Sequence, residues 1–147
     1  MSDLNAILEM FPNTERKLSL QGQNDPRERK EFGDKKVAAH GDESLVQANG
    51  IGFCCKKGLK PESPNQDDFV VLQCGAEFSF FGVMDGHGES GHLVAQYVMD
   101  KMPETLGKQK SLKESTEKGI FDAVKECVDQ LPDQGVNTAF SGTTCVF

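Results

Sequence analysis

Hydrophobic residues are sparse in the first third of this 147-residue chain and dense in the rest, where their spacing changes from strand-like to helix-like. Runs rich in β-branched and aromatic residues predict strands at 51–56, 69–74 and 78–84. In the third run Phe80 and Met84 alternate with Phe81 and Val83, so both faces are apolar. This pattern predicts a central strand that is buried on both sides.

Helical spacing follows the strands. Apolar residues recur every three or four positions from Leu93 to Met102, before a proline at 103, and again from Ile120 to Leu131. A last run, residues 138–147, predicts a fourth strand. Strands without intervening helices indicate an antiparallel sheet, and helices after them indicate an α+β fold.

Residues 1–48 differ in composition, with 7 basic and 9 acidic residues among scattered Gly, Asn, Gln and Pro. We expect a mobile extension, with the folded domain beginning at residue 49. One exception is the apolar stripe of Leu4, Ile7, Leu8 and Phe11, which predicts a short amphipathic helix over residues 3–11. So short a helix needs a surface to hold it, on the protein's own body or on a docking partner, and otherwise frays.

Charge and cysteine content narrow the class of protein. With 16 Lys and Arg against 23 Asp and Glu, the net charge of −7 argues against nucleic acid and anionic membrane surfaces as partners. No apolar run is long enough to span a bilayer, and the N-terminus lacks a signal-peptide pattern. Five cysteines without a Cys-x-x-Cys pair indicate reduced thiols. We therefore expect an intracellular protein, cytoplasmic or nuclear.

The candidate chemistry lies where the apolar strand ending at Met84 runs into Asp85-Gly86-His87-Gly88. A carboxylate buried at the end of such a strand costs several kcal/mol unless a cation compensates it. Asn65-Gln66-Asp67-Asp68 begins the preceding strand and would lie beside Asp85 if the two strands pair. Carboxylates with carbonyls and water suit Mg²⁺ or Mn²⁺ better than zinc. Alternatively, Asp85 is a turn residue that caps the next helix. Asp67 and Asp68 would then be solvated residues at the start of a strand.

A different interpretation is a dinucleotide-binding turn, because residues 86–91 match Gly-x-Gly-x-x-Gly between a strand and a helix. Asp85 would then place a carboxylate next to the pyrophosphate, and the expected acidic residue after a second parallel strand is missing. The antiparallel strand order also disagrees with that fold. We therefore reject this interpretation.

The motif at 85–88 resembles the metal-binding signature of the metal-dependent protein phosphatases, the protein phosphatase 2C family. Residues 64–69 (Pro-Asn-Gln-Asp-Asp-Phe) resemble the family's first acidic motif, and Ser141-Gly142-Thr143-Thr144 resembles the strand motif that follows its two helices. The three motifs occur in the family's order. The resemblance covers about residues 49–147, as the N-terminal half of a catalytic domain.

The resemblance implies hydrolysis of phosphoserine and phosphothreonine in phosphoproteins by a metal-activated water, with two Mg²⁺ or Mn²⁺ ions. By residue, it implies that Asp85 bridges the two metals, that the Gly86 carbonyl ligates one of them and that Asp67 completes the acidic lining. His87 is the candidate general acid for the leaving alkoxide. Glu62 stands where the family usually has an arginine that contacts phosphate, so Lys57 is the substitute candidate.

The resemblance also implies part of a two-sheet antiparallel β-sandwich flanked by helices, in α-β-β-α layers. Family members have a further half that supplies more metal ligands and completes both sheets, so we expect an incomplete domain here. Two functions follow: a protein serine/threonine phosphatase whose activity belongs to the complete domain, or a catalytically incomplete regulatory or binding fragment.

Overall fold

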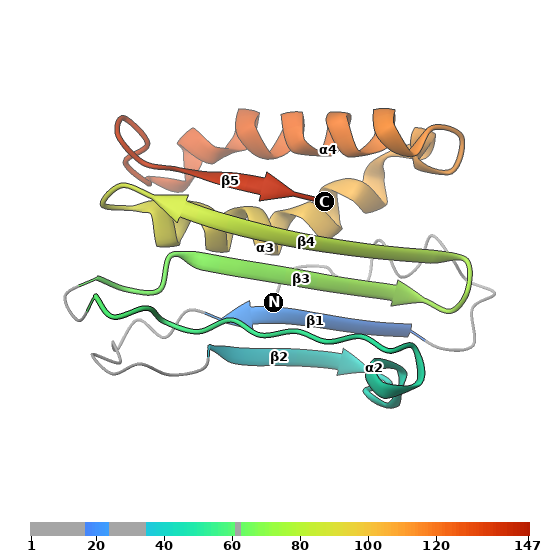
Figure 1. Ribbon diagram of the computed structural model, residues 1–147. Coiled ribbons are helices and arrows are strands. Elements are labelled where there is room, and N and C mark those ends of the chain that lie inside the picture. The colour runs from blue at the N-terminus through green and yellow to red at the C-terminus, as the bar shows by residue number, and fades with distance from the viewer. Residues whose placement is uncertain (1–16, 24–34, 61–62) are drawn as a thin grey trace.

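The computed structural model describes residues 17–23, 35–60 and 63–147, which form one antiparallel sheet with its two longer helices on one face (Figure 1). The strands lie in the order β2-β1-β3-β4-β5. Their bounds are β1 Lys17–Gln23, β2 Lys36–Gly41, β3 Asp67–Cys74, β4 Phe78–His87 and β5 Gly142–Val146. The helices are α2 Ser44–Ala48, α3 Gly91–Lys108 and α4 Thr116–Gln130, with 3₁₀ turns at Lys110–Lys113 and Leu131–Gln134. The predicted α+β class is confirmed.

The larger hydrophobic core lies between the sheet and helices α3 and α4. Alternate residues of β3 and β4, such as Leu72 and Met84, point toward α3 and are fully buried there. Met99, Met102 and Leu106 fill the core from the α3 side. This packing explains why the helix periodicity in the sequence was strong.

The opposite face of the sheet is only partly covered. Leu18, Leu20, Phe69 and Val71 form a second cluster there, covered by Leu45 of α2 and by the 51–55 segment. On β4, however, the side chains of Phe81 and Val83 are 49% and 58% exposed. The predicted burial of β4 on both sides is therefore wrong within the described part of the chain.

The first 48 residues contribute more structure than we expected. Strands β1 and β2 belong to the sheet, and β1 is buried between β2 and β3. The expectation of a mobile extension is therefore wrong for residues 17–23 and 36–48. The hydrophobic pattern of β1 is weak because two of its buried side chains, those of Ser19 and Gln21, are polar. The predicted helix over residues 3–11 lies outside the described residues.

The predicted strand at 51–56 is also wrong. This segment is extended, but only Lys56 makes a strand-like bridge. The position beside β3 that it would occupy is taken by β1, which pairs with β3 over Lys17 to Gln21. The strands predicted at 69–74, 78–84 and 138–147 are confirmed as β3, β4 and the shorter β5. In the described residues, none of the helices is both long and apolar enough to span a membrane.

Candidate functional site

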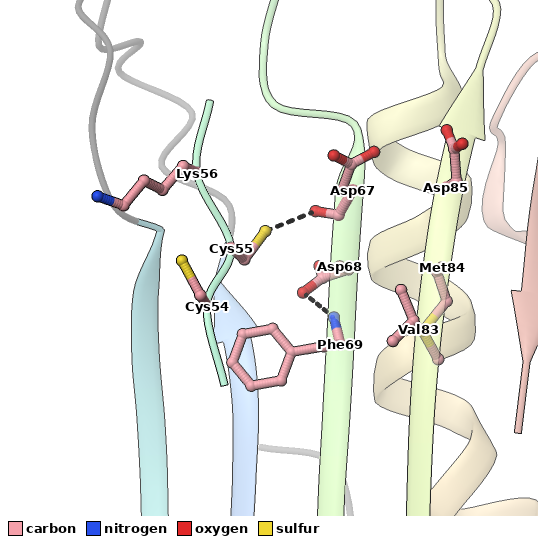
Figure 2. Close-up of a pocket in the computed structure, with 9 residues that line it drawn as sticks. All are labelled: Cys54, Cys55, Lys56, Asp67, Asp68, Phe69, Val83, Met84 and Asp85. Carbon is pink, nitrogen blue, oxygen red and sulfur yellow. Dashed lines mark hydrogen bonds between the residues drawn. The ribbon is translucent and has the colours of Figure 1, made fainter. Parts of the chain in front are cut away.

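Two aspartates face each other across neighbouring strands at one end of the sheet. Asp67, the first residue of β3, is the register partner of Asp85 on β4. Both side chains are exposed and lie on the sheet face away from α3, as Figure 2 shows. The predicted juxtaposition is thus confirmed, whereas the expected burial of Asp85 is wrong because this face of β4 is open.

The electrostatics of this pair favour a cation. The pKa of Asp67 is raised, first by partial burial and then by the negative charge of Asp85, while Lys35 opposes the shift. Within the described residues, neither carboxylate forms an ion pair with a lysine or arginine. Two adjacent carboxylates that form no ion pair are the hard oxygen donors that Mg²⁺ and Mn²⁺ prefer. The donor set therefore fits one side of a divalent metal site.

These residues do not form a complete set of metal ligands. No group of three or more His, Cys, Asp or Glu side chains that could hold a metal ion occurs in the part of the chain that the structure describes. Metal sites with two carboxylates need further oxygen ligands from carbonyls, water or other segments.

The loop after Asp85 is fixed to the first acidic motif by Gln66. The Gly86 N–H donates to the Gln66 carbonyl at 3.1 Å, and the Gln66 side-chain amide donates to the Gly88 carbonyl at 2.5 Å. Gly86 is buried, and a β-carbon there would lie 2.4 Å from the Gly91 carbonyl oxygen. Gln66 was not among the predicted functional residues, although it lies inside the motif that carried the prediction. It holds two of the three motifs together.

The third motif completes the same end of the sheet. Ser141 Oγ accepts a hydrogen bond from the Ser90 N–H at 2.9 Å, and Thr144 Oγ1 donates to the Asp85 carbonyl at 3.4 Å. His87 is exposed, and its ring lies against Gly142, where a β-carbon would be 2.9 Å from Nε2. The three motifs, far apart in the sequence, therefore meet around Asp85.

A pocket of about 310 Å³ opens beside the acidic pair (Figure 2). Its lining comes from three segments: Cys54, Cys55, Lys56, Asp67, Asp68, Phe69, Val83, Met84 and Asp85. Lys57, the predicted phosphate contact, is not part of this lining and is only 9% exposed. Its neighbour Lys56 lines the pocket instead.

Asp68 has a different environment from Asp67. Its carboxylate forms an ion pair with Lys35, whose Nζ lies 3.2 Å from Oδ2 of Asp68. The side chain of Asp68 is 0% exposed and that of Lys35 is 3% exposed. Burial raises the pKa of Asp68, and Lys35 opposes this shift. Lys35 Nζ also donates to the Asp67 carbonyl. The alternative of a solvated Asp68 is therefore wrong, and Lys35 anchors the start of β3.

Nothing in the sequence singled out Lys35, because it lies in a stretch where charged residues are common. Its role depends on a buried partner 33 positions away in the chain, which only the fold brings close.

Comparison with known proteins gives partial matches to one family. The chain is 33% identical over 97 residues to "Probable protein phosphatase 2C 35" of Arabidopsis thaliana, covering 62% of this chain and 28% of the relative. It is 30% identical over 142 residues to "Probable protein phosphatase 2C 72" of the same plant, covering 84% of this chain and 42% of the relative. A third, "Probable protein phosphatase 2C 58" of Arabidopsis thaliana, is 31% identical over 99 residues, 65% of this chain and 34% of the relative.

The chain thus spans less than half the length of these curated relatives. No protein-family profile matches it, and no solved structure matches it. The relatives share the family that the three motifs predicted, and the fold brings those motifs to one end of the sheet. The chain is a protein phosphatase 2C-like sequence.

Proposed function

We propose that this chain is part of a metal-dependent protein serine/threonine phosphatase that acts on intracellular phosphoproteins. The observation that carries the proposal is the Asp67–Asp85 pair, two exposed carboxylates in register on β3 and β4 that form no ion pair with a lysine or arginine among the described residues. The names of the relatives support the phosphatase class. The proposal adds the metal dependence and the roles of individual residues.

In this proposal Asp67, Asp85 and the Gly86 carbonyl hold two divalent cations, Mg²⁺ or Mn²⁺, together with ligands from outside the described residues. When bound, the cations supply neutralisation of the phosphate charge and activation of the attacking water. Gln66 keeps Gly86 and Gly88 in place through its two hydrogen bonds. The site therefore needs no covalent nucleophile of its own.

His87 is the proposed general acid. Strand alternation places it on the same face of β4 as Asp85, and its ring is exposed to solvent. From there an imidazolium can donate its proton to the alkoxide of the departing serine or threonine. The role of Lys57 as a phosphate contact stays a prediction. Of these two neighbouring lysines, Lys56 lines the pocket beside Asp67 and Asp85, and Lys57 does not.

The test is the substitution Asp85→Asn, which keeps the shape of the side chain and removes its charge. We expect Mn²⁺-dependent hydrolysis of a phosphothreonine peptide, measured on the longest natural form of the protein, to fall by about 10²-fold or more. Asp129→Asn is the matched control, because Asp129 is exposed on α4 and pairs only with Lys125 in the described structure. Mn²⁺-dependent turnover that persists in Asp85→Asn would refute the proposal.

A second candidate function is a regulatory or binding fragment that does not turn over substrate. It is favoured by the absence of a three-ligand group among the described residues. For the 147-residue chain alone it predicts measurable binding of the phosphothreonine peptide without release of phosphate. Phosphate release by the chain alone would exclude this candidate.

A further inference from the structure

The acidic end of β3 extends beyond the part of the strand that pairs with β1. Strand β1 pairs with β3 from Lys17 to Gln21, and the last pair joins Gln21 to Val70. Asp67, the first residue of β3, lies beyond this ladder and has β4 on its other side. Its main-chain N–H and C=O groups on the β1 side therefore need partners other than β1, because such groups are paired in folded proteins.

Side chains supply these partners. The Asp67 N–H donates to Asn65 Oδ1 at 3.1 Å. The Asp67 carbonyl accepts hydrogen bonds from Lys35 Nζ and from Cys55 Sγ, and Figure 2 shows the second of these. The two donors are themselves joined, because the Lys35 N–H donates to the Cys55 carbonyl at 2.8 Å. The main chain of Asp67 is thus held by side chains at a place where β1 does not hold it.

Lys35 is kept in this position by Asp68. The ion pair between them is buried, with Nζ 3.2 Å from Oδ2. Gly22, near the end of β1, leaves room for it, since a β-carbon there would lie 2.2 Å from Asp68 Oδ1 and 3.2 Å from Lys35 Cδ. A buried ion pair adds little net stability, because lost hydration offsets the attraction between the charges. Its contact with the main chain of Asp67 is the feature of this pair that bears on the candidate metal site.

We propose that Lys35 is a positioning residue for the metal site, which holds the Asp67 carboxylate opposite Asp85 by fixing the Asp67 carbonyl. The inference rests on the proposed function, in which these two carboxylates bind divalent cations. An ammonium group has no acceptor site and cannot itself ligate a metal. Its positive charge repels a cation, so any contribution of Lys35 to metal affinity has to come from geometry. The electrostatic and positioning effects of Lys35 on metal binding therefore have opposite signs.

Two variants that differ only at position 35 separate these effects. Asp68→Asn removes the negative charge but keeps an oxygen for the Phe69 N–H and leaves Lys35 able to donate to Asp67. The double variant Lys35→Met, Asp68→Asn also removes the ammonium group, so no unpaired charge is buried. We expect its urea midpoint to equal or exceed that of Asp68→Asn. A lower midpoint, or a double variant that does not fold, shows that Lys35 supports the fold itself and overturns the proposal.

Amide hydrogen exchange in the metal-free 147-residue chain gives the first readout. The Gly86 N–H donates to the carbonyl of Gln66, the neighbour of Asp67, at 3.1 Å. We expect this amide to exchange at least about tenfold faster in the double variant than in Asp68→Asn, while the amides of α4 exchange equally. Equal exchange at Gly86 overturns the inference, whether or not metal binds. If Asp68→Asn does not fold, the unsubstituted chain is the reference, and the double variant has the same net charge.

Mn²⁺ binding to the longest natural form of the protein, followed by electron paramagnetic resonance, gives the second readout. We expect the double variant to bind Mn²⁺ at least about tenfold more weakly than Asp68→Asn, although it has one positive charge fewer. Equal or tighter binding, which electrostatics alone predicts, overturns the inference and leaves the proposed function standing. If the unsubstituted protein binds no Mn²⁺, the proposed function fails, and the inference that rests on it fails too.

Discussion

At the scale of single residues, the loop at the site depends on a glycine in a left-handed conformation. Gly88 has φ +81°, and a β-carbon there would lie 2.1 Å from the carbonyl oxygen of Phe140. Gly135 also has a positive φ, +69°, but a β-carbon there would have open space. A side chain at either position would strain the backbone, but only at position 88 would it also collide with a neighbouring segment.

This pair gives a matched prediction. We expect Gly135→Ala to lower the free energy of unfolding by about 1–2 kcal/mol, the cost of a side chain in the left-handed region. Gly88→Ala should cost about 2–4 kcal/mol, because the 140–141 segment must also move away. Urea denaturation measures both, and similar losses would show that the approach of Phe140 is not a constraint.

The acidic residues show what the sequence could predict at this scale. Asp67 and Asp85 were predicted as neighbours because each lies at an end of an apolar strand and the strands follow each other. The separate roles of Asp67 and Asp68 were not predictable from the motif, because strand alternation sends one side chain to the open face and the other to the buried face. The strand register and the position of Lys35 decide which is which.

At the scale of secondary structure, α3 continues past the proline that the sequence suggested as its end. Pro103 lies inside the helix, which extends to Lys108. A proline cannot donate to the carbonyl four residues earlier, here that of Met99. The side chain of Gln21 on β1 donates to that carbonyl at 3.4 Å. Strand β1, which was not predicted from the sequence, thus supplies the missing hydrogen bond. The continuation of α3 past Pro103 could therefore not be predicted without first predicting β1.

The exposed side of α3 carries a pH-dependent contribution to stability. Glu104 contacts Lys101 at 2.7 Å and Lys108 at 2.8 Å, and its hydrogen bonds to these lysines lower its pKa. A lowered pKa in the folded state stabilises the fold above the ordinary range of a glutamate, and the effect is lost as the pH falls through the lowered value. Stability supplied by Glu104 is therefore present at neutral pH and absent in strong acid.

We accordingly expect Glu104→Gln to reduce the free energy of unfolding by about 0.5–1 kcal/mol at pH 7, a modest value because the lysines are partly exposed. The difference from the unsubstituted chain should disappear as the pH falls through the lowered pKa of Glu104. Glu77→Gln is the control, since Glu77 is exposed in the turn between β3 and β4 and forms no ion pair in the described structure. A loss of stability that does not depend on pH would contradict this assignment.

At the scale of the whole molecule, the two faces of the sheet are unequal. Helix α3, with α4 beside it, covers one face, whereas Phe81, Val83 and Val146 are exposed on the other. Val83 and Val146 are register partners, so their side chains are neighbours on this face. An exposed apolar surface of this kind is typical of a face that packs against another segment or another protein.

The adjacent residues Phe80 and Phe81 test this asymmetry, because they point to opposite faces and are 5% and 49% exposed. Phe80→Thr removes a ring from the core, where it stacks on Phe147, and should cost about 3–5 kcal/mol in urea denaturation. Phe81→Thr should cost less than about 1 kcal/mol and should lower the concentration-dependent association of the 147-residue chain in sedimentation experiments. If Phe81→Thr destabilises the chain as strongly as Phe80→Thr, the second face is already covered in solution and the sheet is not open on that side.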